Sequence, residues 1–414
     1  MLSPEMLDTV VNRGVSEIIS RDEFIRLLQS GSPLRLKMGF DPSRPDIHLG
    51  HTVGLRKLRQ LQDLGHQVIL IVGDWTAQIG DPSGQSATRP MLTHQQVMEN
   101  AQSYLRQFFK VVDRDRTQVV EQSEWFGKFT LADVIGLTGR FTVAQFLQRS
   151  DFAQRFAEQR PIAITELLYP LLQAYDSVAI ESDVEFGGTD QMFNLLVGRE
   201  LQGMMGQTPQ QCFMMPILPG TDGVQKMSKS LDNYIAVDEA PADMYGKVMS
   251  IADNMIVRYY ELLTDLPSAD LADLERDIGQ DTVNPMEHKK RLAWDITSQF
   301  HDATAADAAQ SRFERVVQGR SLPDEMPEVS LVALRSLSLE GEGEMPTIRA
   351  DRLLVAAGLA ASNAEARRLL SQGAVELIPP TGGSTRLDDD RADVTPAAGD
   401  VLRAGRRRFV RIVE

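Results

Sequence analysis

The sequence predicts an α/β fold with a parallel sheet covered by helices, and three stretches near its start indicate this. Residues 34–40 alternate as a buried strand does, and residues 51–64 follow with the amphipathic spacing of a helix. Residues 66–72 are strongly apolar, as expected for a second, central strand of a parallel sheet. Strand, helix and strand in this order form a βαβ unit.

The loop between the first strand and its helix carries the first candidate site. It is rich in proline and ends at His48, Gly50 and His51, where the helix begins. The first amides of a helix lack partners within it and carry the positive end of its dipole, which favours an anion. Both imidazoles can face one side of the first turn, and Gly50 leaves room for a flat ligand. We interpret this as a triphosphate site. A capping or surface role is the alternative, and a metal pair would need further ligands that are not nearby.

A second candidate site is the polar, glycine-containing loop over residues 222–233. It carries Lys226 and Lys229, three residues apart. Two ammonium groups on a mobile loop can follow negative charge as it builds on a departing pyrophosphate. A lysine-rich loop alone is usually a solvated surface, so this interpretation depends on its combination with the histidine pair.

Together the two motifs resemble those of a known family. His-Leu-Gly-His (48–51) and Lys-Met-Ser-Lys-Ser (226–230), with Lys226 175 positions after His51, are similar to the signature motifs of class I aminoacyl-tRNA synthetases. The resemblance implies a Rossmann-like catalytic domain that uses ATP with Mg²⁺ to form an aminoacyl-adenylate. It also implies catalysis by His48, His51, Lys226 and Lys229, and contact with ATP by these residues, Gly50 and Ser228. Without the resemblance, the spacing indicates only a nucleotide-binding α/β enzyme.

Composition and charge exclude several classes of protein. At 414 residues the chain is long enough for two or three domains with sizeable cores. The single Cys212 excludes a disulfide framework and a multi-thiolate zinc site, and we expect no bound metal site. No apolar run approaches the ~20 residues that span a bilayer, and the N-terminus does not resemble a signal peptide. We therefore expect a cytoplasmic protein without a membrane partner. A net charge of −15 argues against indiscriminate nucleic-acid binding, and we expect no DNA partner.

The segments around the first βαβ unit are expected to be largely helical. Residues 1–33 show apolar pairs at helical spacing, residues 93–110 indicate another helix, and residues 118–120 part of a short strand. From 129 to 160 the pattern is helical without strand signals. This fits a helical insertion, at about 125–162, between two halves of a nucleotide-binding fold.

Asp81 lies in a loop that follows the second central strand. The loop reads Ile-Gly-Asp-Pro-Ser-Gly (79–84). Loops at the carboxyl ends of parallel strands are where such sheets bind ligands, so Asp81 is expected to face the crevice. A plain turn is the alternative.

The segment from Leu167 to Asp176 carries a polar stripe on an otherwise apolar helix. Tyr169, Gln173 and Asp176 share one helical face. Three hydrogen-bonding groups there are costly unless they meet a polar ligand or each other, although a polar surface stripe is the alternative. Pro170 removes one amide and could kink the helix.

This stripe and two other stretches resemble the amino-acid pocket of tyrosyl-tRNA synthetases. The other stretches are the Asp81 loop and Gly-Gly-Thr-Asp-Gln (187–191). The resemblance implies a tyrosine site in which Asp81, Tyr169 and Gln173 hold the substrate ammonium and Asp176 accepts the phenolic hydroxyl. Gly39 and Asp41 would make further contacts with tyrosine. Asp190 and Gln191 would contact the ribose and the adenylate. It also implies that the insertion contributes a homodimer interface, although its apolar residues Phe141, Val143, Phe146, Leu147, Phe152 and Phe156 could equally be core.

One position departs from the better-known pattern of that family. Lys37 stands where many members carry a tyrosine that shares the substrate hydroxyl. A lysine there would donate as a cation or point elsewhere, and it is retained here as a candidate tyrosine-binding residue. The Lys-Met-Ser-Lys-Ser spelling indicates a second bacterial branch.

The remainder of the chain is expected to form two further domains. Residues 1–235 would be the catalytic domain and residues 236–320 a helical domain that resembles the one placed against the tRNA anticodon arm, with long helices over 243–263 and 285–317. Residues 321–346, rich in proline and glutamate, are expected to be a linker with at most one short ordered element.

Residues 347–414 resemble the small α+β RNA-binding module of α-L type. They carry a net charge of +2, against −17 for the rest of the chain. The order helix, helix capped by Ser362, strand from Gly373 carries the resemblance. Its phosphate-facing surface would be formed by Arg349, Arg352, Arg367 and Arg368, joined by Arg406 to Arg408. Solvated surface arginines are the alternative.

The chain is identified from these features as a member of the tyrosyl-tRNA synthetase family. Such enzymes form tyrosyl-adenylate from L-tyrosine and ATP, release pyrophosphate, and transfer tyrosine to the 3′ end of tRNA(Tyr). A tryptophanyl-tRNA synthetase is the nearest alternative, and Asp176 argues against it because indole offers one donor on a different vector. A catalytically inactive, synthetase-like RNA-binding protein is the other, and the intact histidine and lysine motifs argue against it.

Overall fold

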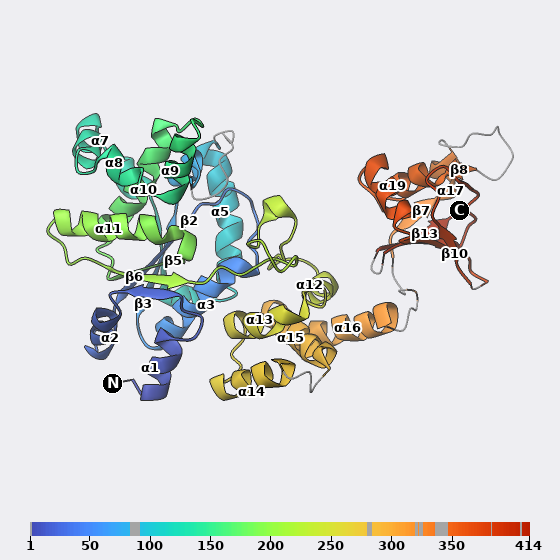
Figure 1. The fold of residues 1–414 in the computed structure, drawn as a ribbon, viewed down its shortest axis with the longest axis horizontal. Helices are drawn as coiled ribbons and strands as arrows, with labels where there is room; N and C mark the ends of the chain where they lie inside the picture. The colour runs from blue at the N-terminus through green and yellow to red at the C-terminus, as the bar shows by residue number, and fades with distance from the viewer. Residues whose placement is uncertain are drawn as a thin grey trace. The chain divides into compact units, whose positions relative to one another are not determined.

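The computed structural model contains two compact units, residues 1–306 and residues 307–414 (Figure 1). It describes residues 2–82, 92–279, 284–318, 322, 326–335, 347–381, 383–405 and 408–414. Each unit has its own sheet.

The first unit is built on a mostly parallel sheet. In the described chain its strands follow the order β1-β6-β5-β2-β3-β4, and β1 runs antiparallel to its neighbour β6. The strands are β1 (Glu17–Ile19), β2 (Arg35–Phe40), β3 (Gln67–Val72), β4 (Thr117–Glu121), β5 (Val184–Gly188) and β6 (Gln211–Met215). Because β2 lies between β3 and β5, the strand order reverses there, and such a reversal point is where open α/β sheets bind ligands. The predicted α/β class is confirmed.

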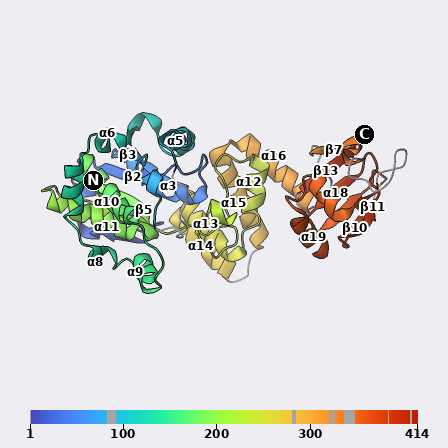
Figure 2. The same cartoon turned by 90° about the horizontal axis from the view of Figure 1, so that it is seen from above.

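Helices cover both faces of this sheet (Figures 1 and 2). α10 (Ile164–Ala179) packs against α11 (Met192–Met204) on one face, and α3 (Leu49–Asp63) covers the other. Alternate residues of β2 face these layers: Lys37 bonds to α10, whereas Met38 lies against Gly54 of α3. The other helices before residue 236 are α1 (Pro4–Val11), α2 (Arg21–Gln29), α4 (Thr76–Ile79), α5 (His94–Phe108), α6 (Ser123–Phe126), α7 (Leu131–Thr138), α8 (Val143–Phe146) and α9 (Ser150–Ala157).

The N-terminal segment is helical over α1 and α2, as expected, but a short strand interrupts it. The chain turns at Gly14, whose φ of 60° favours glycine, and Glu17–Ile19 then forms the edge strand β1. The apolar Ile18 is buried opposite Phe213 of β6. Pairing with the otherwise open edge of β6 outweighs the helical spacing, which could not reveal a partner so far along the chain.

The insertion is helical, as predicted, and its apolar residues divide into two groups. Phe146 and Phe152 are buried in a cluster with Leu171 of α10. Phe141 and Leu147 pack against the same cluster, whereas Val143 and Phe156 are exposed.

The helical segment after residue 236 is confirmed, but both long helices predicted there are interrupted. The chain forms α12 (Pro241–Val248), α13 (Ile256–Leu263), α14 (Ser268–Gly279), α15 (Pro285–Phe300), α16 (Ala303–Phe313) and a π-helical turn (Glu314–Gln318). Up to residue 306 this segment belongs to the same compact unit as the sheet. One reason is Arg13, which donates to backbone carbonyls at Tyr260, Glu261 and Thr264.

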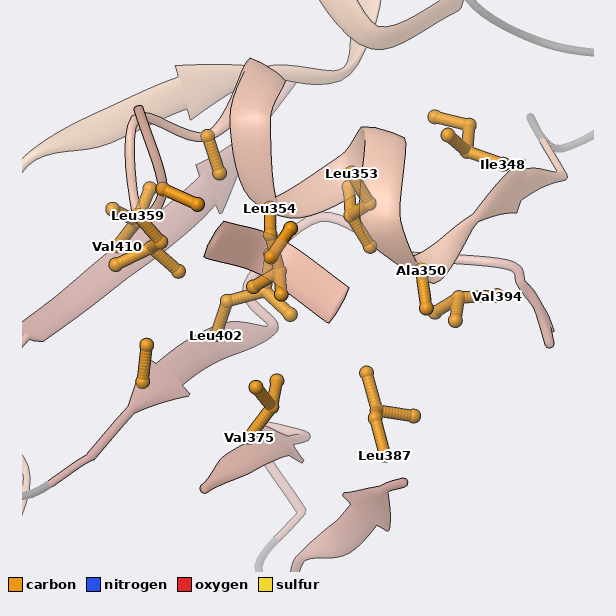
Figure 3. Packing of buried hydrophobic residues seen from close by; sticks show 14 of the residues in the cluster. Ile348, Ala350, Leu353, Leu354, Leu359, Val375, Leu387, Val394, Leu402 and Val410 are labelled. Atoms are coloured by element: carbon orange, nitrogen blue, oxygen red, sulfur yellow. The ribbon is translucent and has the colours of Figure 1, made fainter. Parts of the chain in front are cut away.

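The second unit packs helices on a small sheet. Strands β7 (Glu328–Ser330), β9 (Val375–Ile378), β10 (Thr385–Leu387), β12 (Val401–Ala404) and β13 (Arg408–Val413) follow the order β10-β9-β12-β13-β7, and β8 (Ile348–Arg349) pairs with β11 (Asp393–Val394). Helices α17 (Leu331–Arg335), α18 (Ala350–Ala356) and α19 (Asn363–Ser371) complete it. Leu354 of α18, Leu402 and Val410 meet in the core (Figure 3). Ser362 caps α19 as predicted.

Part of the predicted linker belongs to this second unit. β7 pairs in parallel with β13, and Leu331 and Leu334 of α17 are buried in the core around Leu354. Residues 328–335 are therefore an ordered part of the second unit and not a linker, because they form one edge of its sheet. The glutamate- and glycine-rich stretch at 340–344 lies outside the described residues.

Candidate functional site

A pocket of about 400 Å³ lies at the carboxyl edge of the first sheet. It is lined by residues at or just after the strand ends: Asp41 after β2, Gly73 after β3, Gln122 after β4, Asp190 two residues after β5 and Pro216 after β6. Parallel strands bring their carboxyl ends to one edge, so residues far apart in the chain meet there.

Most of the predicted site residues line this pocket. They are Gly39, Asp41, His48, Gly50, His51, Asp81, Tyr169, Gln173, Asp176, Asp190, Gln191, Lys226 and Ser228. Two do not: Lys229 bonds to Asp46 beside the pocket, and Lys37 lies behind it.

The two histidines stand side by side at the start of α3. Their ring centroids are 4.0 Å apart, and the His48 amide donates to His51 Nδ1 at 3.3 Å. Burial, aided by Lys229, lowers the pKa of His51 to about 4, and burial also lowers the pKa of His48 well below its usual value. Both are therefore neutral near pH 7, and each ring carries one N–H donor. A Cβ at Gly50 would lie 2.9 Å from His48 Nδ1, so the lack of a side chain at this position leaves room for the His48 imidazole.

The lysine loop is closed onto acidic groups. Lys226 Nζ lies 3.3 Å from Asp190 Oδ2. Lys229 Nζ lies 3.1 Å from Asp46 Oδ1, donates to the Asp46 carbonyl, and stands 5.5 Å from the centroid of the Tyr104 ring. Each cation thus has an anionic partner that an incoming polyphosphate can replace.

Asp41 forms one polar centre in the deep part of the pocket. Its oxygens accept from Thr76 Oγ1 at 2.7 Å and from the Tyr169 hydroxyl at 2.8 Å. Burial raises the pKa of Asp41 to about 7. Tyr169 on α10 is thereby fixed toward the strand end.

Asp176 forms the second deep polar centre. It is 2% exposed and accepts from Gln122 Nε2 at 2.8 Å and from Trp125 Nε1 at 3.2 Å. The Gln122 oxygen accepts from the Thr76 amide, which fixes its nitrogen toward Asp176. Burial raises the pKa of Asp176 to about 7. α10 continues through Pro170 and keeps Tyr169, Gln173 and Asp176 on the pocket face, as the stripe predicted.

Asp81 lies at the pocket mouth. Its Oδ2 accepts from Gln191 Nε2 at 2.6 Å, and Arg149 of the insertion lies 4.0 Å from Oδ1. A residue of the insertion thereby lies against Asp81 of the pocket.

The structure does not bring Lys37 into the pocket lining. Its ammonium is fully buried, 2.9 Å from Glu185 Oε1, and donates to the Gln173 carbonyl and to Ser177 Oγ. The expected direct contact of Lys37 with tyrosine has no support in this arrangement, because these three partners hold the ammonium between β2 and α10, outside the pocket lining.

Sequence reasoning missed Asp46, Thr76, Tyr104, Gln122, Trp125 and Glu185. Two of them had a visible signal. Gln122 directly follows a strand and thus stands at the ligand edge. Glu185 is a lone acid in an otherwise apolar strand. The others are recognisable only by their contacts.

The arginines predicted to face RNA divide into two pairs in the second unit. Arg349 and Arg367 bond to the buried Asp351, and Arg367 also lies 3.3 Å from Asp390. Arg352 and Arg368 are exposed. Arg406 and Arg407 lie outside the described residues, and Arg408 bonds to the Leu359 carbonyl.

The described residues lack two further kinds of feature. No group of three or more histidine, cysteine, aspartate or glutamate side chains among them could hold a metal ion. None of the helices in this part of the chain is long and apolar enough to cross a membrane.

Comparison with known proteins gives consistent matches. The profile of the tRNA synthetases class I (W and Y) matches residues 29–318. The chain is 56% identical over 411 residues to the tyrosine–tRNA ligase of Dehalococcoides mccartyi (strain CBDB1), covering 99% of both chains. It is 49% identical over 411 residues to that of Thermotoga maritima, covering 99% of this chain and 98% of the relative. The tyrosyl-tRNA synthetase of Archaeoglobus fulgidus, solved with L-tyrosine, shares the fold, with a TM-score of 0.61 and 24% identity, over 74% of this chain and 99% of that one.

Proposed function

We propose, from the premise that this chain belongs to the tyrosine–tRNA ligase family of class I tRNA synthetases, that its pocket activates L-tyrosine with ATP and passes it to tRNA(Tyr). The observation that carries the assignment is one pocket that combines a helix N-terminus with paired histidines, the loop that carries the two lysines, and two carboxyl groups, the buried Asp176 and the half-buried Asp41. The first half suits a polyphosphate, and the second suits an amino acid with a terminal hydroxyl.

At the nucleotide end, positioning and charge stabilisation carry the reaction. The tyrosine carboxylate attacks the α-phosphorus of ATP in line, an acyl phosphate bond forms, and pyrophosphate leaves with the bonding electrons. Neutral His48 and His51 donate to phosphate oxygens without demanding a proton transfer. Lys226 and Lys229 exchange Asp190 and Asp46 for the β and γ phosphates. Mg²⁺ would enter as part of the ATP complex.

At the amino-acid end, buried carboxylates select the substrate. Asp41 and Asp81 supply negative charge for the ammonium group, with the Gln173 amide oxygen as a further acceptor. Asp176 accepts the phenolic hydroxyl, and its two donors Gln122 and Trp125 hold it in the geometry for this. Phenylalanine leaves that buried acceptor without a partner, which is the basis of strong rejection.

Pyrophosphate exchange with each of the twenty amino acids tests the assignment. We expect exchange with tyrosine and much slower exchange with phenylalanine and tryptophan. Tryptophan-dependent exchange would assign the chain to the other branch of the matched family. No exchange with any amino acid in a folded protein would leave a binding function alone.

We propose that the second unit binds tRNA phosphates through its exposed arginines. Arg352 and Arg368 are free of the Asp351 cluster that engages Arg349 and Arg367. Removing one arginine that neutralises a phosphate should reduce the slope of log K against log salt by ~0.7–0.9. Arg352→Ala and Arg368→Ala should each show that change, while Arg391→Ala in an exposed turn serves as a matched control. A slope unchanged in both variants would contradict this role.

We propose that two copies associate through the insertion. α7, α8, α9 and the start of α10 expose large apolar side chains: Leu131 (75%), Ile135 (61%), Val143 (60%), Phe156 (66%) and Ile164 (80%). Exposed apolar residues concentrated on one segment are typical of an interface, and a twofold dimer is the commonest arrangement. Ile135→Glu should convert a dimer to a monomer in light scattering, whereas Val332→Glu, equally exposed on α17, should not. A monomeric wild-type protein at micromolar concentration would contradict the proposal.

A further inference from the structure

An ion pair lies beneath the pocket, between the sheet and α10. Lys37 of β2 and Glu185 of β5 are register partners, with Nζ 2.9 Å from Oε1 and exposed fractions of 0% and 1%. Lys37 also donates to the Gln173 carbonyl at 2.8 Å and to Ser177 Oγ at 2.7 Å. A buried ion pair usually stabilises a fold no better than apolar side chains of similar size. A reason other than stability is therefore needed.

The surrounding helices are shaped to hold this pair in one geometry. Glu185 Oε2 accepts from Ser177 Oγ at 3.2 Å and from Gln210 Nε2. A Cβ at Gly198 of α11 would lie 3.1 Å from Glu185 Oε2 and closer still to Gln210, so glycine makes the room. The cluster is thus fixed from both strands and both covering helices.

Two pocket residues on α10 are governed by this cluster. Gln173 Nε2 donates to Glu185 Oε1 at 3.0 Å, which orients the amide so that its oxygen is the acceptor. Asp176 senses both charges, because Lys37 favours its ionised form and Glu185 opposes it. The pair therefore affects both Gln173 and Asp176 from outside the pocket lining.

We propose that the Lys37–Glu185 pair is a positioning element for tyrosine selection, which orients Gln173 toward the substrate ammonium and keeps Asp176 able to accept the phenolic hydroxyl. This inference rests on the proposed function, since it deepens the amino-acid half of that site. Lys37 acts on the hydroxyl through Asp176, which explains how a lysine occupies this strand position without entering the pocket.

The groups around Asp176 determine the sign of the expected effects. Burial raises the pKa of Asp176, Lys37 lowers it and Glu185 raises it. Tyr169 on the same helix has a pKa well above its usual value and stays neutral, and Gln122 and Trp125 are uncharged donors. Loss of Lys37 should therefore raise the pKa of Asp176, and loss of Glu185 should lower it.

The test is the pH dependence of the ratio of kcat/KM for tyrosine to kcat/KM for phenylalanine in adenylate formation. Both substrates carry the same ammonium, so effects of Asp41 cancel and the ratio reports Asp176. In the full-length protein, Lys37→Met should move the midpoint of this ratio upward by about one pH unit or more and reduce the ratio at pH 7 by ~10-fold. Glu185→Gln should move the midpoint downward.

The double variant Lys37→Met/Glu185→Gln is the structural control. It replaces the pair by uncharged side chains of similar length and should unfold at a temperature near that of the wild type. Its midpoint should lie above that of the wild type, because Lys37 has the larger influence on Asp176.

A purely structural role predicts a different pattern, in which activity falls with both amino acids and the midpoint stays in place. Unmoved midpoints, or midpoints that move in the same direction in the two single variants, would overturn the proposal. So would a double variant that fails to fold, since the pair would then be needed for the fold itself. A wild-type protein without tyrosine-dependent activity would instead refute the proposed function, whatever the variants did.

Discussion

The end of the pocket proposed to bind the nucleotide carries Lys226 on a loop at the surface, whereas the end proposed to bind the amino acid carries Asp176 on a buried face of α10. Lys226 is 45% exposed and is paired with Asp190, a partner that a substrate can displace. Asp176 is 2% exposed and is held by two donors that no substrate displaces. The first end can move with the reaction, and the second is fixed before the substrate arrives.

This contrast indicates which groups stabilise charge in the proposed reaction and which groups select the amino acid. In the proposed reaction, developing charge is stabilised by groups on a loop and a helix N-terminus, which would bind most tightly as pyrophosphate departs. Selection of the amino acid depends on groups whose desolvation is complete in the folded protein. Substitutions at the two ends should therefore change different kinetic quantities.

The largest expected effect lies at the buried end. Asp176→Ala should abolish most of the discrimination between tyrosine and phenylalanine, which a site of this kind holds at ~10⁴–10⁵. The ratio of kcat/KM for the two amino acids measures it, with Asp176→Asn as the variant that preserves volume. If Asp176→Ala still strongly preferred tyrosine, another group would have to recognise the hydroxyl, and the buried end would not be the selective one.

The next effect belongs to the lysine loop. Lys229→Ala should slow adenylate formation by ~10²-fold or more, with little change in tyrosine affinity, because one charge-stabilising donor is removed. Stopped-flow measurement gives the rate constant. Lys247→Ala, which removes a lysine paired with Glu239 outside the pocket, is the matched control. An unchanged rate constant would exclude Lys229 from the mechanism.

The pH dependence separates the two ends without any substitution. The pKa values of Asp41 and Asp176 are both raised to about 7, while that of His51 is lowered to about 4. If substrate binding needs both carboxylates ionised, kcat/KM for tyrosine should fall below pH 7, by ~10-fold per unit for each group. Phenylalanine should show the weaker dependence, because it leaves Asp176 unused. A profile that is flat from about pH 5 to 7 would contradict this assignment.

The same shifts predict the sign of a stability effect. An aspartate with a raised pKa binds its proton more tightly in the folded than in the unfolded state. The contribution of Asp41 and Asp176 to the free energy of unfolding should therefore decline as pH rises from about 4 to about 7. His48 and His51, whose pKa values are lowered, contribute with the opposite sign, so the difference between the wild type and a variant without the two carboxyls isolates the effect. Urea titrations across this range, with an Asp41→Asn/Asp176→Asn variant as control, would detect it.

The smallest expected effect concerns the ion pair between Lys229 of the lysine loop and Asp46. Asp46→Asn should lower KM for ATP by no more than ~5-fold, since a partly exposed ion pair is worth ~0–1 kcal/mol and ATP competes with it for Lys229. Asp238→Asn removes an aspartate of similar exposure, paired with Lys110 away from the pocket, and should leave KM for ATP unchanged. A raised KM for ATP in Asp46→Asn would mean that Asp46 assists nucleotide binding.

The sequence alone determined those features that are contiguous or periodic. The apolar runs at 34–40 and 66–72, the helix between them and the stripe of Tyr169, Gln173 and Asp176 follow from local spacing, and the structure contains them. The histidine and lysine motifs are short and contiguous, because a helix N-terminus and a loop each present their functional groups from a few successive residues. The α/β class and the family follow from these.

Only the tertiary structure decided the features that need two distant segments. Ile18 lies in a strand because β6 offers an edge, and residues 328–335 are ordered because β13 offers another. Lys37 stays outside the pocket lining because Glu185 and Ser177 bind its ammonium between the sheet and α10. The local sequence around each residue contains no record of these partners, since burial and charge pairing depend on which segments the completed sheet and helices bring together.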